Sequence, residues 1–212
     1  MNEYHKIQTV FDRDPTTKFK TLLMGQYATP DFEYLANNEW EFTEKIDGTN
    51  IRIMITDGTV SFGGRTDNAQ LPVPLLQHLT NTFQPQATKL NQEFPHGACL
   101  YGEGYGGNIQ KVGHLYGKDP SFILFDVRIG RYWLNRAAVE DIAHCFGITA
   151  VPVIGTGTLK DMVKLVASQP RSLCGDLTME GVIARPTLEL LSRHGSRIIT
   201  KLKCRDFHEF TS

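Results

Sequence analysis

The chain has few cysteines, and their arrangement suggests neither a metal site nor a disulfide framework. Its 212 residues include four cysteines, which are far apart and form no C-x-x-C pair: Cys99, Cys145, Cys174 and Cys204. Zinc sites and disulfide-rich folds use recognisable cysteine spacings. We therefore expect reduced thiols that are mostly buried.

The sequence also lacks a long apolar run and a strong charge of either sign. No stretch is long enough to span a bilayer, and the chain opens without a signal-peptide pattern, so a cytoplasmic location is expected. A net charge of -1 neither demands nor excludes a nucleic-acid partner, because binding depends on where basic residues cluster. Such a cluster, which a solvated strand face would also produce, is formed by Arg193, His194, Arg197, Lys201, Lys203 and Arg205.

Residues 1–38 mix polar residues with isolated aromatics and prolines, which indicates an irregular segment wrapped on the domain surface. From Glu39 the pattern becomes periodic. Ile51, Ile53 and Ile55 alternate with other side chains up to the turn sequence Asp57-Gly58, which predicts a hairpin whose return strand contains Val60 and Phe62.

Three segments have helical spacing and start signals. A helix with apolar residues at Leu71, Leu75, Leu76 and Leu79 tolerates Pro72 and Pro74 only near its start. Asn135 is expected to cap a second helix, whose apolar face contains Val139, Ile142, Ala143 and Phe146. Thr158 is expected to open a third helix, whose apolar face contains Leu159, Met162, Val163 and Val166.

Strand-like runs occur at 98–101, 122–127, 181–184 and 197–202. Strands and helices alternate without a β-α period, which predicts an α+β fold built on antiparallel sheets. We find no repeat and no interior linker, and we expect residues 1–212 to form a single domain.

The most informative stretch runs from Glu44 to Asn50, with the sequence Glu-Lys-Ile-Asp-Gly-Thr-Asn. It has the form of a lysine nucleophile at a strand-loop edge. A lysine attacks only where its pKa is lowered by desolvation or nearby cations. Gly48 would let the backbone approach a phosphate, and Asp47 would hold a hydrated metal or orient the amine. The tetrapeptide alone also occurs at ordinary strand-to-turn junctions.

Further motifs follow in order along the chain: Gly63-Gly64-Arg65, Tyr101-Gly102-Glu103-Gly104, Phe122 to Asp126, Met179 to Ile183, and Lys201-Leu202-Lys203. This ordered set, over about residues 40–207, resembles the covalent nucleotidyltransferases, which are the DNA ligases, RNA ligases and mRNA capping enzymes. The resemblance implies an ATP-grasp-like ligase adenylation fold, with antiparallel sheets flanked by helices.

Within this superfamily the chain looks most like the bacteriophage RNA ligase 2 family. The residues that carry this likeness are Glu44 to Asn50, the extension Tyr105 to Lys111, and Asp119 to Asp126. The Ile109-Gln110-Lys111 extension favours RNA ligases over the other two groups.

The resemblance implies a role for each candidate residue. Lys45 would attack the α-phosphorus of ATP, with Lys201 and Lys203 stabilising the phosphate charge. In isolation, Lys201 and Lys203 would be taken for solvated lysines on an edge strand. Glu103 would bind a ribose hydroxyl, and Phe125 would stack on adenine, although a Phe at this place in a strand is also typical of the core.

Asp47 and Glu180 would hold the water shell of Mg²⁺, with Mn²⁺ as an acceptable substitute. Arg65 would contact a phosphate of the nucleotide or of the RNA 5′ end. Asn50 and Gln110 would act on the strand ends, and a turn amide and a loop amide are their equally acceptable alternatives. Grouped by role, the expected catalytic residues are Lys45, Lys201, Lys203 and Arg65. The expected nucleotide-binding residues are Glu44, Lys45, Asn50, Arg65, Glu103, Phe125, Glu180, Lys201 and Lys203. The expected metal-binding residues are Asp47 and Glu180, and the expected RNA-binding residues are Asn50, Gln110 and Arg185.

Three positions depart from the family pattern. Thr43 replaces an arginine two residues before the nucleophile, and Arg185 replaces a lysine five residues after the motif glutamate. Asp47 stands where the best-known member has histidine, and aspartate is the residue common in the wider superfamily. These changes leave the core catalytic set in place.

Only nine residues follow Lys203, too few for the OB domain that DNA ligases and capping enzymes carry. We therefore expect no OB domain and no C-terminal helical domain, so that the domain surface, residues 1–38 or a partner chain must hold the RNA ends.

The resulting hypothesis is an ATP-dependent RNA ligase that joins 5′-phosphate and 3′-hydroxyl ends, in a nicked duplex or a broken hairpin, through lysyl-AMP. The alternatives are a DNA nick ligase, a GTP-using capping enzyme, and a non-catalytic nucleotide- or RNA-binding module.

Overall fold

The structure is a computed structural model that describes residues 3–210, with side chains up to Phe207. The chain divides into two compact units, which we describe separately. The central unit comprises Met1–His5 and Asp47–Val151, and the lysine unit comprises Lys6–Ile46 and Pro152–Ser212. The expectation of a single domain over residues 1–212 stays a prediction.

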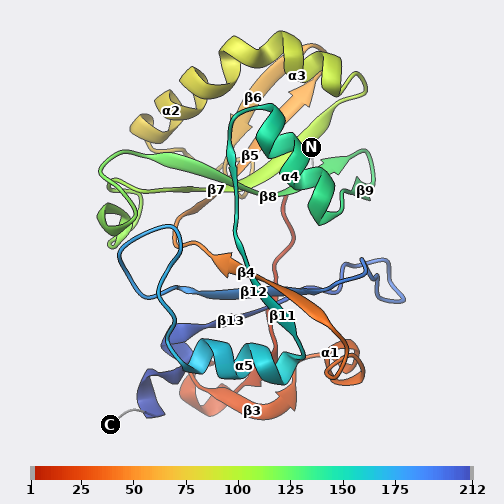
Figure 1. The fold of residues 1–212 in the computed structure, drawn as a ribbon, viewed down its shortest axis with the longest axis vertical. Coiled ribbons are helices and arrows are strands. Elements are labelled where there is room, and N and C mark those ends of the chain that lie inside the picture. The colour runs from red at the N-terminus through yellow and green to blue at the C-terminus, as the bar shows by residue number, and fades with distance from the viewer. Residues whose placement is uncertain (1–2, 211–212) are drawn as a thin grey trace. The chain divides into compact units, whose positions relative to one another are not determined.

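The central unit is built on a sheet with the strand order β10-β8-β7-β5-β6, in which β9 also pairs with β8. Only the β10–β8 pair is parallel. The strands are β5 (Thr49–Thr56), β6 (Thr59–Gly63), β7 (Ala98–Tyr105), β8 (Ser121–Ile129), β9 (Tyr132–Trp133) and β10 (Thr149–Ala150). Helices α2 (Val73–Phe83), α3 (Ala87–Glu93) and α4 (Arg136–Cys145), with the 3-10 turns η2 (Gln84–Gln86) and η3 (Gly113–Leu115), complete the unit (Figure 1).

The lysine unit contains a second sheet, with the order β1-β13-β12-β4-β11, and a two-stranded hairpin, β2-β3. The strands are β1 (Gln8–Thr9), β2 (Phe11–Arg13), β3 (Leu22–Tyr27), β4 (Trp40–Lys45), β11 (Val153–Gly157), β12 (Gly181–Pro186) and β13 (Thr200–Lys203). The helical elements are η1 (Pro15–Thr17), α1 (Pro30–Tyr34), α5 (Leu159–Ala167) and η4 (Cys204–Phe210). Helix α5 covers one face of the sheet, and its buried side chains Leu159, Met162 and Val166 belong to the core of this unit (Figure 1).

The local signals in the sequence produce the expected elements. Asp57 and Gly58 take positive φ angles of 49° and 78°, as a tight hairpin turn requires, and β5 and β6 pair around them. Asn135 Oδ1 accepts a hydrogen bond from Ala138 N at 3.0 Å and caps α4. Thr158 and Asp161 form a capping box at the start of α5. The α+β prediction is confirmed.

Several expectations need correction. Residues 1–38 are not irregular throughout, because β1, β2, β3 and α1 lie there and Val10, Phe11 and Leu22 are buried in the core. These elements are too short to show a period in the sequence. Leu76 does not share the buried face of α2, where Leu75, Leu79 and Phe83 lie. Cys145 is exposed, whereas Cys99 and Cys204 are buried.

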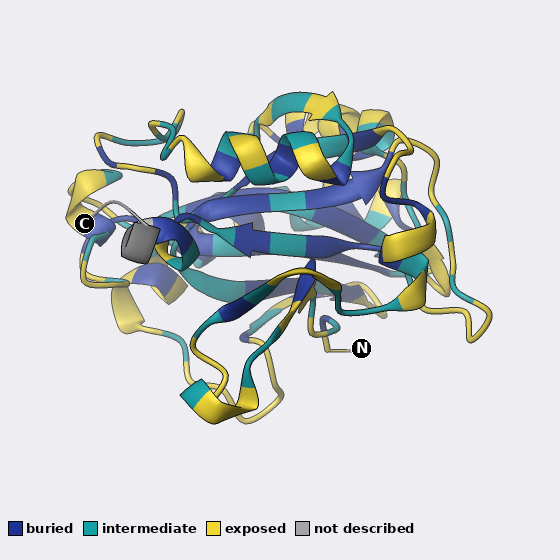
Figure 2. Ribbon diagram, turned by 90° about the horizontal axis from the view of Figure 1, so that it is seen from below, coloured by how far each residue is buried: buried dark blue, intermediate teal, exposed yellow. Residues whose placement is uncertain are grey.

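The pattern of burial follows the two sheets. In Figure 2 the strands are mostly buried or intermediate, and the exposed residues lie on loops and on the outer faces of helices. Among residues 3–210, every helix is too short or too polar to cross a bilayer.

Candidate active site

Three neighbouring strands of the lysine unit bring Lys45, Glu180 and Lys203 together. Lys45 is the last residue of β4, and it pairs with Gly181, the first residue of β12. Gly181 also pairs with Lys203, the last residue of β13. Glu180 immediately precedes Gly181, so its carboxylate lies between the two lysines.

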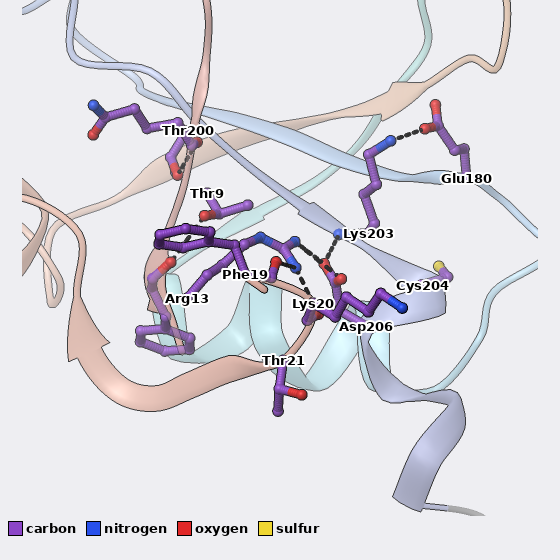
Figure 3. Close-up of polar contacts among 12 residues, drawn as sticks. Thr9, Arg13, Phe19, Lys20, Thr21, Glu180, Thr200, Lys203, Cys204 and Asp206 are labelled. Carbon is purple, nitrogen blue, oxygen red and sulfur yellow. Dashed lines mark hydrogen bonds and ion pairs between the residues drawn. The ribbon is translucent and has the colours of Figure 1, made fainter. Parts of the chain in front are cut away.

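Glu180 binds both lysines through separate oxygens. Its Oε2 lies 2.5 Å from Lys45 Nζ, and its Oε1 lies 2.5 Å from Lys203 Nζ. Figure 3 shows the Lys203 side chain directed at this carboxylate. Burial disfavours the charged carboxylate, but the neighbouring Lys45 and Lys203 outweigh this effect and hold the pKa of Glu180 below its usual 4.5.

Gly181 allows this close arrangement. A Cβ atom at this position would lie 2.1 Å from the carbonyl oxygen of Leu202 and 2.8 Å from Cα of Lys203. Both are backbone atoms of β13, which cannot move away as a flexible side chain can. A glycine is therefore required for β12 and β13 to pair at the level of Glu180.

Lys201 lies on the same strand face as Lys203. Along β13, Thr200 and Leu202 are buried, whereas Lys201 and Lys203 are intermediate in exposure. Burial and the nearby charges of Lys45 and Lys203 lower the pKa of Lys201 from 10.5 to about 8. The alternative of a solvated edge strand does not fit, because β13 lies between β1 and β12.

Glu44 and Arg185, both predicted to bind ligands, are buried in the lysine unit. The Glu44 carboxylate accepts a hydrogen bond from the hydroxyl of Ser172 and another from Leu173 N at 2.9 Å. Arg185 Nε lies 3.7 Å from Glu41 Oε1. The contacts predicted for Glu44 with nucleotide and for Arg185 with RNA stay predictions.

The central unit positions a second group of predicted residues around Gly48. Asn50 on β5 is paired with Glu103 on β7. A Cβ at Gly48 would lie 2.2 Å from Gly104 O and 2.8 Å from Glu103 Cγ, so only glycine fits against β7 there. Gln110 Nε2 donates a hydrogen bond to Gly48 O at 3.0 Å, which places Gln110 at this turn as well.

Two polar groups near Gly48 are notable. Asn50 Oδ1 is buried and has no hydrogen-bond partner among the residues that the structure describes, as expected of a group that is completed by a ligand. Asp47 N donates to the hydroxyl of Tyr116 at 3.1 Å, which fixes the backbone of the turn.

Phe125 lies in an aromatic cluster of the central unit and is half-buried. Its ring meets the ring of Tyr4 edge-on, with centroids 5.0 Å apart. The Tyr4 hydroxyl donates a hydrogen bond of 2.5 Å to the buried Asp126. These contacts fit both roles expected of Phe125, which are packing in the core and stacking on adenine. Arg65 lies exposed in the loop that follows β6.

The predicted site residues are thus divided between the two units. Glu44, Lys45, Glu180, Arg185, Lys201 and Lys203 belong to the lysine unit, and Asp47, Asn50, Arg65, Glu103, Gln110 and Phe125 belong to the central unit. Along the chain, the boundary falls between Ile46 and Asp47, inside the motif that contains the predicted nucleophile, Lys45.

Two residues next to predicted site residues, Tyr4 and Ser172, were not predicted. Ser172 binds the Glu44 carboxylate from 128 positions away, and Tyr4 binds Asp126 from 122 positions away. Such distant partners leave no local signal in the sequence.

The donor groups fit a magnesium ion that is held mainly by phosphates. In the part of the chain that the structure describes, no group of three or more His, Cys, Asp or Glu side chains forms a metal cage. Mg²⁺ commonly keeps several waters and takes one or two carboxylates together with substrate phosphates. Glu180 offers such a carboxylate beside Lys45 and Lys203, which are predicted to contact the phosphates.

Comparison with known proteins decides the family. The family model for RNA ligase matches residues 38–203. The chain belongs to the RNA ligase family. A search of curated proteins found no match. The narrower likeness to the bacteriophage RNA ligase 2 group stays a prediction.

This RNA ligase family member also resembles solved structures of Naegleria gruberi RNA ligase. A mutant with ATP and Mn has a TM-score of 0.69 and 18% identity, and the match covers 100% of this chain and 58% of that chain. The structure with PPi has a TM-score of 0.66 and 18% identity, with 100% and 60% covered. The chain therefore shares their fold and spans about three-fifths of their length.

Proposed function

We propose that this chain is an ATP-dependent RNA ligase that seals 5′-phosphate and 3′-hydroxyl RNA ends. The observation that carries the proposal is the convergence of Lys45, Lys201 and Lys203 around Glu180. A nucleophilic amine beside two further cations suits attack on a phosphate, where negative charge must be stabilised. Membership of the RNA ligase family supports the same reaction class.

The reaction proceeds in three steps. The Lys45 amine, once deprotonated, attacks the α-phosphorus of ATP, and a P–N bond replaces the P–O bond to the departing pyrophosphate. The RNA 5′-phosphate then takes the AMP from Lys45. Finally, the RNA 3′-hydroxyl attacks the adenylated 5′ end, forms the phosphodiester and releases AMP.

The remaining residues bind and orient the substrates. Lys201 and Lys203 bind the α-phosphate, and Glu103 and Phe125 bind the ribose and the adenine. Arg65 binds a phosphate, and Asn50 and Gln110 act on the RNA ends. Mg²⁺, bound through Glu180 and Asp47, would supply positive charge at the phosphate undergoing attack. In this proposal residues 1–212 form one nucleotidyltransferase domain with a ligase adenylation fold.

Labelling with radioactive nucleotide tests the first step. We expect α-labelled ATP to label the wild-type protein and the control variant Lys160→Ala, because Lys160 is exposed on α5. We expect Lys45→Ala to remain unlabelled. Labelling by GTP alone would instead favour a capping enzyme, and the absence of labelling by either nucleotide would favour a binding module.

Sealing of nicked duplexes tests the substrate. Matched nicks with RNA or DNA on each side of the break separate an RNA ligase from a DNA ligase. RNA joining that survives Lys45→Ala would contradict the mechanism.

A further inference from the structure

An open cavity in the lysine unit adjoins Lys201 and Lys203 and has an excess of cationic residues. Its volume is about 900 Å³, in the upper part of the range for ligand pockets. Acidic residues in the lining are Asp12 and Asp206. Six basic residues line it: Lys6, Arg13, Lys20, Lys201, Lys203 and Arg205.

Two of these cations are already neutralised. Arg13 Nη2 lies 3.0 Å from both carboxylate oxygens of Asp206, and Lys203 is paired with Glu180 (Figure 3). The other four, Lys6, Lys20, Lys201 and Arg205, form no ion pair with the side chains of residues 3–207. The cavity therefore carries net positive charge, which suits a polyanion.

Arg13 also fixes the loop that forms one wall of the cavity. Its Nη1 donates a hydrogen bond to Lys20 O at 2.9 Å, while Nη2 holds Asp206. The Asp206 carboxylate in turn accepts a hydrogen bond from Lys203 N at 3.4 Å. The loop between β2 and β3 is thereby tied to the end of β13, where the predicted phosphate-binding lysines lie.

This loop presents an exposed aromatic ring on a strained backbone. Phe19 is 63% exposed and lines the cavity. Lys18 and Phe19 have φ angles of 56° and 60°, a conformation that residues other than glycine rarely adopt. Such strain is maintained only where the surrounding contacts impose it, and it is concentrated at functional sites.

We propose that this cavity binds an unpaired stretch of the RNA strand next to the end that is joined. The Phe19 ring stacks on a base, Lys6, Lys20 and Arg205 bind backbone phosphates, and the strand continues toward Lys201 and Lys203. Proteins that bind single strands combine a basic groove with exposed aromatic rings in this way. Pyrophosphate would gain nothing from the aromatic ring, and a duplex keeps its bases stacked. The inference rests on the proposed function and specifies how its substrate is held.

Binding of a labelled single-stranded RNA, followed by fluorescence anisotropy, tests the role of Phe19. We expect Phe19→Asn to weaken the affinity by about tenfold, the effect of losing one base-stacking contact. Asparagine tolerates a positive φ, so the loop conformation is preserved. Phe19→Tyr keeps a ring and should bind almost as wild type does. The control Tyr34→Asn removes a ring that is 87% exposed on α1 and does not line the cavity, and it should bind RNA normally.

The phosphate contacts have a separate test in the salt dependence of binding. Lys20→Ala should make the slope of log affinity against log salt shallower by about 0.7, the value for one phosphate contact to a single strand. An unchanged slope would contradict the contact. Titration with inorganic pyrophosphate tests whether the cavity binds this free anion in place of the RNA backbone. A Lys20→Ala variant that loses pyrophosphate binding but retains RNA binding would overturn the proposal.

Adenylylation of Lys45, measured without RNA, separates this inference from the proposed function. We expect Phe19→Asn to reduce RNA affinity more than it reduces adenylylation. Wild-type affinity for RNA in Phe19→Asn would overturn the docking proposal even if adenylylation is normal. Failure of the wild-type protein to adenylylate would overturn the proposed function, and a tenfold effect of Phe19→Asn on RNA affinity would still support the docking site.

Discussion

Lys45 Nζ lies 2.5 Å from Glu180 Oε2, and the second oxygen of this carboxylate lies equally close to Lys203 Nζ. An ammonium group that is ion-paired in this way has no free electron pair for attack. The arrangement therefore orders the predicted nucleophile without activating it. In the proposed reaction, Lys45 must lose its proton and separate from Glu180 before it attacks the phosphate.

Replacing Glu180 by glutamine should destabilise the lysine unit in a pH-dependent way. The folded-state pKa of Glu180 is lowered, so its carboxylate stabilises the fold above about pH 4.5, and this contribution is lost as the pH falls through the lowered value. We expect a loss of about 1–3 kcal/mol at neutral pH, between the values for exposed and buried pairs. Urea denaturation on both sides of pH 4.5 measures the difference.

Glu140→Gln is the matched control for this experiment. Glu140 pairs with Arg136 at 2.7 Å but its side chain is 52% exposed, so its replacement should have a much smaller effect. A loss for Glu180→Gln that is the same at every pH would show that the lysine charges are not the cause.

Lys201 should produce an alkaline limit near pH 8 in the adenylylation rate. Its pKa is lowered to about 8 in the free protein, so it loses the charge that is proposed to bind phosphate as the pH rises through this value. We expect the second-order rate constant for adenylylation by ATP to fall above this pH, and the fall to move to higher pH in Lys201→Arg, because arginine stays charged. A profile that is identical in Lys201→Arg would exclude Lys201 as the group that titrates.

Gly181→Ala should impair both stability and adenylylation. The new Cβ would lie 2.1 Å from Leu202 O, so β12 and β13 must separate, and Lys203 would be displaced from Glu180. We expect a loss of about 1–3 kcal/mol in the free energy of unfolding, as for other overpacked sites. Gly117→Ala is the control, because a Cβ there meets no atom within 4 Å. Equal stability and activity of the two variants would disprove the tight fit.

Tyr4→Phe should destabilise the central unit. The substitution removes the hydroxyl that donates a 2.5 Å hydrogen bond to Asp126, a buried carboxylate. We expect a cost of about 1–3 kcal/mol, because a buried charged acceptor loses a partner. Thermal unfolding of Tyr4→Phe beside Tyr34→Phe, whose ring is 87% exposed, measures the effect. A melting temperature equal to that of the control would contradict the prediction that the Tyr4 hydroxyl stabilises the central unit.

Elements with strong local signals were predictable, and those that depend on distant partners were not. Asn135 and Thr158 determine their helix starts through bonds to residues only three positions away. The strand β1 has no such signal, because its two residues become a strand only by pairing with β13. Leu76 was placed wrongly because helical spacing alone does not reveal the edge of a buried face.

The sequence by itself determined the family, the order of the motifs and the local structure around Lys45, because each motif is a short run of neighbouring residues and the order of the motifs is read directly along the chain. Only the tertiary structure decided that Glu180 binds Lys45 and Lys203 at once, and that Arg13 and Phe19 line the same cavity as the lysines of β13. These contacts join residues that are from 23 to almost 200 positions apart. Strand pairing and packing create them, and no local pattern in the sequence encodes them.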